Sequence, residues 1–224
     1  MNLFASEIYC RTFGPKNGFG LVMLSEKDEC IKTDILNEAQ KLFRHFGLTK
    51  TTMEDIAKAA GKGKSTLYYY YRSKDQIFDE VVMREMEALF KLTKEAVNAA
   101  DTAEEKLKAF SVTKFKHLQE KANLYKVVRG DLEHNFRCIL DLKHRYDTRE
   151  ISLLRNILKH GMDKGEIKHY ALAELDAIAF VLVCAIRGLE VGLFVENKLP
   201  ESEFDNLESR MDMINDILMR GLKS

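Results

Sequence analysis

Basic and hydroxyl side chains gather in one short segment of the chain. No acid occurs between Asp55 and Asp75, and five positive charges come from Lys58, Lys62, Lys64, Arg72 and Lys74. Hydroxyl groups stand among them, on Ser65, Thr66, Tyr68, Tyr69 and Tyr70. Ammonium, guanidinium and hydroxyl groups bind phosphate oxygens, and a tyrosine ring can also touch a thymine methyl group. The segment is a candidate phosphate-binding surface; a solvated helix face is the alternative that charge alone leaves open.

The net charge of the whole chain gives no such signal. Lys+Arg and Asp+Glu both number 35 among 224 residues, so the local charge of +5 is cancelled elsewhere. With 46% hydrophobic and 31% charged residues, the chain has the material for a core and a hydrated surface. We expect a globular protein that carries a small basic face.

Helical spacing before the basic segment predicts the elements that hold it. A helix that ends at Gly47 would place one apolar face inward, comprising Ile35, Ala39, Leu42, Phe43 and Phe46. Thr51 or Thr52 can cap the following short helix, because Glu54 and Asp55 stand three residues later in capping-box spacing. That helix would turn Ile56, Ala59 and Ala60 inward.

A glycine turn separates this short helix from the next one. Gly61 lacks a side chain and so permits a tight reversal. Ser65 or Thr66 can then open a third helix that ends near Tyr71, and Ser73 can cap a fourth, from Lys74 to about Val97. The apolar side of the fourth helix would comprise Ile77, Phe78, Val81 and Val82.

Three successive tyrosines cannot all be buried on a short helix. Neighbouring residues point about 100° apart, so at least one or two of Tyr68, Tyr69 and Tyr70 must face outward. An aromatic core position suits Leu67 and Tyr71 better. We therefore expect exposed tyrosines beside the basic turn.

This layout is that of a DNA-binding helix-turn-helix, and the residues carry a more specific likeness. Three stretches, Thr51–Gly61, Lys64–Tyr71 and Ser73–Asp75, resemble the DNA-binding domain of the TetR family of bacterial transcriptional regulators. The resemblance covers about residues 28–80. It implies a sequence-specific DNA-binding regulator, a repressor released from its operator by a small-molecule effector.

The family pattern also implies roles for individual residues. Phosphate contacts fall on Thr52 and Lys74, and the remaining contacts with the major groove and its backbone fall on Lys64, Ser65, Thr66, Tyr68, Tyr69 and Tyr70. The chain departs from the pattern at Lys62, where a small apolar residue is usual, at Gly63, where serine is common, and at Ser65, which replaces a frequent glycine. We expect Lys62 to point outward as an extra phosphate contact.

A nucleotide-hydrolysing enzyme is the main alternative that a local motif suggests. Gly63-Lys64-Ser65-Thr66 ends like a P-loop, but the first glycine of that motif would fall on Lys58, and the preceding segment is helical rather than a strand. No serine, cysteine or paired-carboxylate arrangement indicates catalysis. We expect no enzyme activity and no cofactor.

The remaining spacing predicts an all-α fold of about nine helices. Beyond the fourth helix we expect five more, over 103–120, 123–134, 140–161, 171–196 and 201–221. The predicted domains are an N-terminal arm or extension (1–25), a three-helix DNA-binding domain (26–75) and a larger effector-binding and dimerisation domain (76–224). Residues 1–22 are either a flexible arm or an extension that precedes a start at Met23.

The last two helices are predicted to join two copies of the chain. One stripe of the penultimate helix is apolar: Ala177, Ile178, Val181, Leu182, Ala185, Leu189 and Leu193. Phe180, Cys184, Val191 and Phe194 make the same helix apolar nearly all round, so it must be covered on two sides. Met211, Ile214, Ile217 and Leu218 supply a matching stripe on the last helix. A homodimer would place two recognition helices in successive major grooves, about 34–36 Å apart.

The effector site has a weaker signal. Candidate contacts in the larger domain are Phe110, Tyr125, Tyr146, Phe180, Cys184 and Arg187, although aromatic residues at helical spacing are more often ordinary core. Arg187 and Glu190 could instead form an ion pair. His134 and Cys138 have metal-compatible spacing, but two ligands do not make a site, and we predict no metal.

Compartment and mode of action follow from negative signals. The four cysteines are scattered, the N-terminal residues lack an export signal, and the longest apolar stretch, 177–186, is too short to span a bilayer. We expect a cytoplasmic protein with no membrane partner. A DNA-binding dimer with a structural, chromosome-associated role and no effector is the alternative function.

Overall fold

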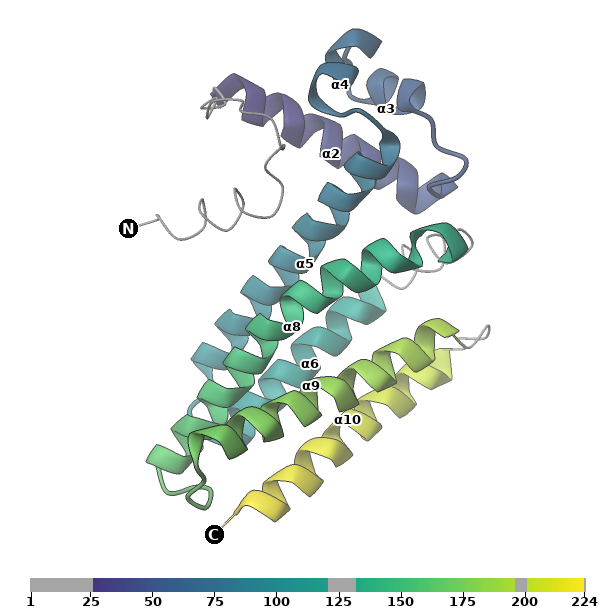
Figure 1. The fold of residues 1–224 in the computed structure, drawn as a ribbon. Helices are drawn as coiled ribbons and strands as arrows, with labels where there is room; N and C mark the ends of the chain where they lie inside the picture. The colour runs from purple at the N-terminus through teal and green to yellow at the C-terminus, as the bar shows by residue number, and fades with distance from the viewer. Residues whose placement is uncertain (1–25, 121–131, 196–200, 224) are drawn as a thin grey trace. The chain divides into compact units, whose positions relative to one another are not determined.

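The computed structural model describes the backbone of residues 26–120, 132–195 and 201–223, and side chains within 27–117, 146–189 and 209–223. The described backbone is all-α, as predicted, and Figure 1 shows its eight helices. They are α2 (Glu26–Phe46), α3 (Met53–Ala59), α4 (Lys64–Tyr70), α5 (Lys74–Ala99), α6 (Ala103–Glu120), α8 (Leu132–Asp163), α9 (Leu172–Val195) and α10 (Glu201–Leu222). Met1–Thr33 and Asp34–Ser224 form separate compact units, and the contacts below are those of the second unit.

One predicted helix boundary is wrong. Two helices were expected over 123–134 and 140–161, but α8 runs without interruption from Leu132 to Asp163. The intervening residues, 135–139, contain neither glycine nor proline, so nothing in the backbone forces a break there. Residues 123–131 of the predicted helix lie outside the described part of the chain.

Glycines and side-chain caps set the bounds of the first helices. Gly47 adopts a φ of 86° directly after α2, and its N–H donates to the Phe43 carbonyl at 3.1 Å. Ser73 caps α5 by accepting a hydrogen bond from the Gln76 N–H, as predicted. These signals are local, which is why spacing alone located them.

The helices α2, α3 and α4 pack around the beginning of α5 over a shared apolar core (Figure 1). The Phe43 and Phe78 rings meet edge to face with centroids 5.6 Å apart. Two sequence expectations fail here. Phe46 is 53% exposed, with Leu48 buried in the loop after α2, and Ala57 rather than Ala59 is the buried alanine of α3. Fully buried members of this core are Ile35, Ala39, Phe43, Ile56, Leu67, Tyr71 and Ile77.

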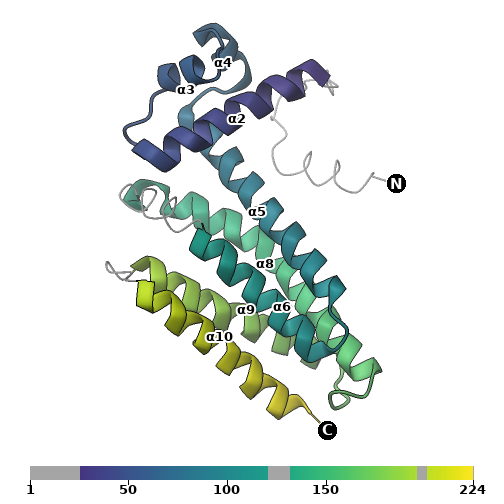
Figure 2. The same cartoon turned by 180° about the vertical axis from the view of Figure 1, so that it is seen from behind.

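The larger core lies among α5, α6, α8, α9 and α10. α6 packs against α5, α8 and α10, and α9 packs against α8; Figure 2 shows these helices from behind. The buried residues of α9 are Leu175, Ala179, Leu182, Val183 and Ile186. Of these, Leu182 alone belongs to the apolar stripe predicted from the sequence. A helix that is apolar nearly all round gives no periodic signal for the face that its own domain covers. Of the predicted stripe on α10, Met211 is buried in this domain and Ile217 is 64% exposed.

A glycine turn joins α8 to α9 and braces the start of α6. Gly165 has a φ of 74°, and the Glu166 N–H donates to the Gly161 carbonyl at 2.8 Å. The Glu166 carboxylate accepts a hydrogen bond from the Ala103 N–H at 2.6 Å, so it satisfies a free donor at the N-terminus of α6. Among the described helices, none is long and apolar enough to cross a membrane.

Candidate nucleic-acid interface

A capping box fixes the first residue of α3. The Thr52 hydroxyl accepts from the Asp55 N–H at 3.2 Å, and the Asp55 carboxylate accepts from the Thr52 N–H at 3.0 Å. The Thr52 hydroxyl also donates to this carboxylate at 2.6 Å. These bonds from Thr52 stabilise the charged carboxylate and hold the pKa of Asp55 below its ordinary value of 3.8. Of the two predicted caps, Thr52 is the one used, while Thr51 is buried.

The turn after α3 reverses the chain, so that Lys62 and Lys64 lie beside α2 and α3. Gly61 has a φ of 63°, and the Lys62 N–H donates to the Ala57 carbonyl at 2.9 Å. α4 then starts at Lys64 with Gly63 as its N-cap and no side-chain cap. Ser65 and Thr66 therefore lie inside the first turn of α4 and do not cap it, because helical geometry begins at Lys64, two residues earlier than a Ser65 cap would require.

The tyrosines of α4 divide between surface and core as their spacing requires. Tyr68 is 46% and Tyr69 79% exposed, while Tyr70 is half-buried with its ring edge to face against that of Tyr69 at 4.9 Å. Leu67 and Tyr71 are fully buried, as predicted. The Tyr71 hydroxyl donates to the Glu80 carboxylate at 2.8 Å and so ties the end of α4 to α5. α4 consequently exposes the rings of Tyr68 and Tyr69, while the buried Tyr71 at its end holds it against α5.

Acids from the preceding helices meet both lysines of the turn. Lys64 forms an ion pair with Glu54 of α3, and the hydrogen bond from Lys64 to Glu54 raises the pKa of the Lys64 ammonium. The Lys62 ammonium lies 3.2 Å from the Asp34 carboxylate of α2, with only 26% of the side chain exposed. The expectation that Lys62 points outward is therefore wrong in this structure, since Asp34 draws its charge back to α2.

Lys74 connects the start of α5 to the loop between α2 and α3. Its ammonium donates to the carbonyls of Leu48 at 2.8 Å and of Thr49 and Thr51 at 3.2 Å. All three ammonium hydrogens thus have acceptors within the chain. Sequence reasoning did not predict this cross-link, because the acceptors are backbone atoms 23 to 26 residues away.

A surface pocket of about 520 Å³ lies beside α3, and spacing gave no hint of it. Its lining includes Phe46, the ring that lies outside the core. The full lining is Leu42, Phe46, Lys50, Thr51, Asp55, Lys58 and Ala59. The pocket therefore combines two lysines and one aspartate with the apolar side chains of Leu42, Phe46 and Ala59.

The described candidate effector residues differ in burial and in their partners. Phe110 is buried in the core of the larger domain, and the Tyr146 hydroxyl donates to the Glu87 carboxylate at 3.2 Å. Burial and the neighbouring Glu87 charge raise the pKa of Tyr146 to about 12. Arg187 pairs with Asp147 of α8, whereas the Glu190 side chain and Tyr125 lie outside the described residues.

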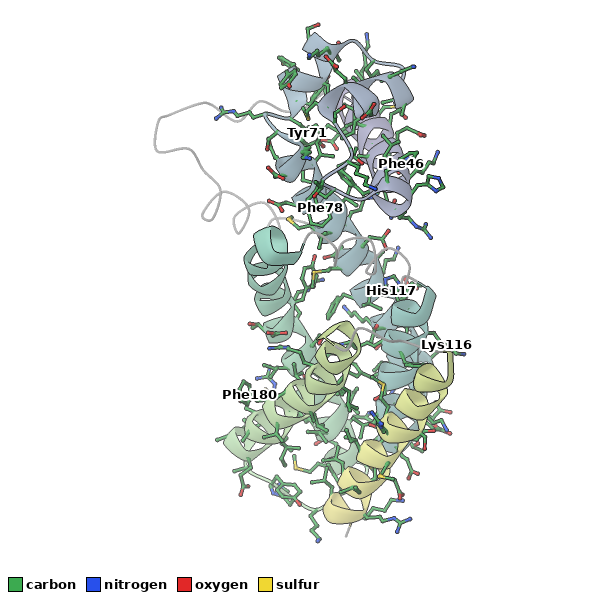
Figure 3. All side chains as sticks on the ribbon, turned by 90° about the vertical axis from the view of Figure 1, so that its right-hand side faces the viewer. Phe46, Tyr71, Phe78, Lys116, His117 and Phe180 are labelled. Carbon is green, nitrogen blue, oxygen red and sulfur yellow. The ribbon has the colours of Figure 1, made fainter. Side chains whose placement is uncertain are left out.

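Phe180 and Cys184 lie on the exposed face of α9. Phe180 is 56% exposed and Cys184 is exposed, because the opposite face of α9 packs into the domain. Figure 3 shows Phe180 on the outer side of α9. The His134 and Cys138 side chains lie outside the described set; within that set, no group of three or more His, Cys, Asp or Glu residues could hold a metal ion.

Polar side chains buried along α6 are functional candidates that sequence reasoning missed. Lys114 donates to the Glu150 carboxylate of α8 at 2.7 Å, and His117 Nε2 lies 3.8 Å from the Glu85 carboxylate of α5. Ser111 exchanges hydrogen bonds of 3.2 and 3.1 Å with Asn215 of α10. The signal was available, since Ser111, Lys114 and His117 recur at helical spacing on the face of α6 that its core residues share.

Polar contacts link α2 to α5 at the residues next to this α6 stripe. The Gln40 side chain of α2 donates to the Glu85 carboxylate, and Arg84 of α5 donates to the Asn37 side chain. Glu85 therefore faces both the first three-helix core and His117 of α6. Arg84 and Glu85 of α5 therefore contact α2, and Glu85 also contacts α6.

Comparisons with known proteins concern both the helix-turn-helix and the longer chain. The model for bacterial regulatory proteins of the tetR family matches residues 35–81. An uncharacterized HTH-type transcriptional regulator of Bacillus subtilis is 24% identical over 136 residues, which are 60% of this chain and 70% of that protein. The HTH-type transcriptional repressor KstR2 of Rhodococcus jostii is 25% identical over 141 residues, 61% of this chain and 69% of that protein.

A solved structure extends the likeness to most of the fold. The crystal structure of a transcriptional regulator from Cytophaga hutchinsonii superposes with a TM-score of 0.74 at 26% identity. The alignment covers 89% of this chain and 100% of that one. The likeness therefore includes the helices that follow the helix-turn-helix.

Proposed function

The chain belongs to the TetR family of transcriptional regulators, and we propose that it is a repressor of specific operators, released by a small-molecule effector. The observation that carries this proposal is a helix-turn-helix whose second helix exposes Tyr68 and Tyr69 beside a basic turn. In this proposal 26–75 binds DNA, and 76–224 binds effector and dimerises. The relative named as a repressor supports the direction of regulation.

The proposed DNA contacts follow from exposure on α3 and α4. Thr52 stands at the exposed start of α3, Lys64 and Ser65 are exposed on the first turn of α4, and Thr66 is half-exposed beside them. Together with Tyr68, Tyr69 and Tyr70 they form a surface of hydroxyl, ammonium and aromatic groups suited to phosphates and base edges. Lys62 and Lys74 act as positioning residues, because Asp34 and three carbonyls occupy their ammonium groups.

Dimerisation through α9 and α10 is proposed from apolar side chains that those helices leave exposed. They are Leu172, Phe180 and Val181 on α9, with Met213 and Ile217 on α10, each at least 56% exposed. Exposed apolar side chains gathered on adjacent helices indicate a protein interface. A two-fold dimer would present two copies of α4 to half-sites about 34–36 Å apart.

Effector control is proposed to pass through α5. An effector in the larger domain that changed the surroundings of Lys114 or His117 would act on the helices that hold Glu85 and Glu150. Because Gln40 also bonds Glu85, a displacement of α5 would alter the orientation of α2 and hence of α4. The effector must bind the released arrangement more tightly than the DNA-bound one.

Selection of binding sites from the source genome tests this function. The purified protein should enrich a small number of fragments that share a two-fold symmetric sequence. A metabolite extract fraction that contains the effector should lower the affinity for those fragments. Enrichment of many unrelated fragments would favour the structural, chromosome-associated role instead.

A further inference from the structure

Folding changes the charge of the surface that the basic segment forms. Residues 56–74 carry five positive charges and no acid. In the structure, however, Glu54 from α3 pairs with Lys64, and Asp34 from α2 pairs with Lys62. The two lysines of the turn therefore meet carboxylates before any DNA arrives.

The Lys64 pair differs from the Lys62 pair in its exposure. The side chains of Lys64 and Glu54 are 57% and 68% exposed, against 26% for Lys62. Water and ions reach both partners of the Lys64 pair, so it can open without disturbing the core. Lys64 is also the first residue of α4, one turn before the exposed Tyr68.

We propose that Glu54 is a specificity-determining residue, which weakens binding to non-operator DNA by holding the Lys64 ammonium until the other contacts of α4 are made. This inference rests on the proposed function, because it requires α4 to face DNA. Non-specific binding depends almost wholly on phosphate neutralisation. An acid paired to an interfacial lysine therefore weakens non-specific binding more than operator binding, which also uses base contacts.

Salt dependence gives the proposal a quantitative form. Each phosphate that a protein neutralises adds about 0.9 to the slope of log affinity against log salt concentration. With Glu54 beside it, Lys64 contributes little net charge to a DNA contact. Glu54→Gln should restore that charge and steepen the slope by about 0.9, which corresponds to an affinity gain that is about threefold larger at 50 mM than at 200 mM salt.

The test measures binding to a 30-base-pair duplex of scrambled sequence over that salt range. Glu54→Gln should bind this duplex about fivefold more tightly than the wild type at the lowest salt, the order expected for one added phosphate contact. The matched control is Glu38→Gln, which removes the same charge from an exposed pair with Lys41 on α2. The control should reproduce neither the gain nor the steeper slope.

Two further variants assign the effect to Lys64. Lys64→Met should weaken binding, and Glu54→Gln should give no gain in the Lys64→Met background. On the duplex selected as operator, the gain from Glu54→Gln should be smaller than on the scrambled duplex. An equal gain on both duplexes, or equal behaviour of Glu54→Gln and Glu38→Gln, would overturn the inference.

The same measurements separate this inference from the proposed function. If Lys64→Met leaves the affinity for both duplexes unchanged, α4 does not bind DNA and the proposed function fails. If Lys64→Met weakens binding while Glu54→Gln behaves like its control, only the role of Glu54 fails. The side chains of Lys64 and Glu54 are 57% and 68% exposed and that of Glu38 is 30% exposed, so the fold should tolerate each substitution.

Discussion

At the scale of single residues, Asp55 shows how one carboxylate connects the helix start to pH. Bonds from Thr52 keep the pKa of Asp55 below 3.8, so the folded state favours the charged form. The stabilisation is fully present above the unfolded pKa and is lost as pH falls through the lower, folded pKa. The charged Asp55 carboxylate therefore stabilises the start of α3 at neutral pH, and this stabilisation is lost in acid when the carboxyl is protonated.

Asp55→Asn should accordingly lower the free energy of unfolding by an amount that depends on pH. The difference from the wild type should be constant from pH 7 to about pH 5 and should shrink below about pH 4, as the wild-type carboxyl takes up a proton. Urea denaturation at a series of pH values measures it. In a Thr52→Ala background the pH dependence should largely disappear; an undiminished difference at pH 3 would contradict this account.

Residue-level prediction from the sequence succeeded where the signal was local. Thr52, Gly61 and Ser73 act as predicted because capping and left-handed turns depend on neighbours within four residues. The partners of Lys62 and Lys74 could not be predicted, since Asp34 and the Leu48 carbonyl are brought near them only by folding. The sequence placed both lysines in the basic segment but did not indicate these partners within the chain.

At the scale of elements, the turn that closes α8 determines how tightly α6 can approach. A Cβ added at Gly161 would lie 2.6 Å from the Ala103 Cβ. Both atoms are bonded directly to a Cα, so their positions are set by the backbone. Neither helix can relieve this contact by rotating a side chain. Glu166, five residues on, also caps the start of α6.

Gly161→Ala should therefore destabilise the larger domain by about 1–3 kcal/mol, the usual cost of overpacking. Thermal unfolding followed by circular dichroism measures this change. Gly221→Ala, on α10 with open space around its added methyl group, serves as the matched control and should leave stability nearly unchanged. A Gly161→Ala protein that unfolds at the wild-type temperature would show that α6 and α8 do not pack in this way.

Element prediction depended on how sharply polarity alternates around each helix. Most of the apolar face of α2 and the approximate bounds of α3, α4 and α5 followed from spacing, because charged residues mark the opposite faces. α9 offered no such contrast, so the sequence did not indicate which of its faces the domain covers. The break predicted before residue 140 failed for a related reason, since no glycine or proline specified it.

At the scale of the whole molecule, the exposed face of α9 is the feature that the single chain leaves unexplained. Phe180 and Val181 are both more than half exposed on one side of α9, while Leu182 and Val183 enter the core. The sequence predicted that this helix needs cover on two sides, and cover of the second side by a partner stays a prediction. Which side its own domain covers emerged only from the packing on α8.

Phe180→Asp should convert the dimer to a monomer, because a charge would be buried without a partner at the proposed interface. Analytical ultracentrifugation measures the change, and operator affinity should fall with it, since each monomer reaches one half-site. Leu92→Asp places the same charge at a 50% exposed apolar position on α5 and should leave the mass unchanged. A Phe180→Asp protein that remains dimeric would place the interface elsewhere.

The most direct test of the central claim is the affinity of Tyr69→Ala for the selected operator duplex. Tyr69 is 79% exposed on α4, so its removal should leave stability intact and cost operator affinity about tenfold or more, the order of one lost contact to a base or phosphate. Leu92→Ala, at an exposed apolar position on α5, should bind like the wild type. Wild-type affinity for Tyr69→Ala, with the fold confirmed by circular dichroism, would contradict the claim that α4 reads DNA.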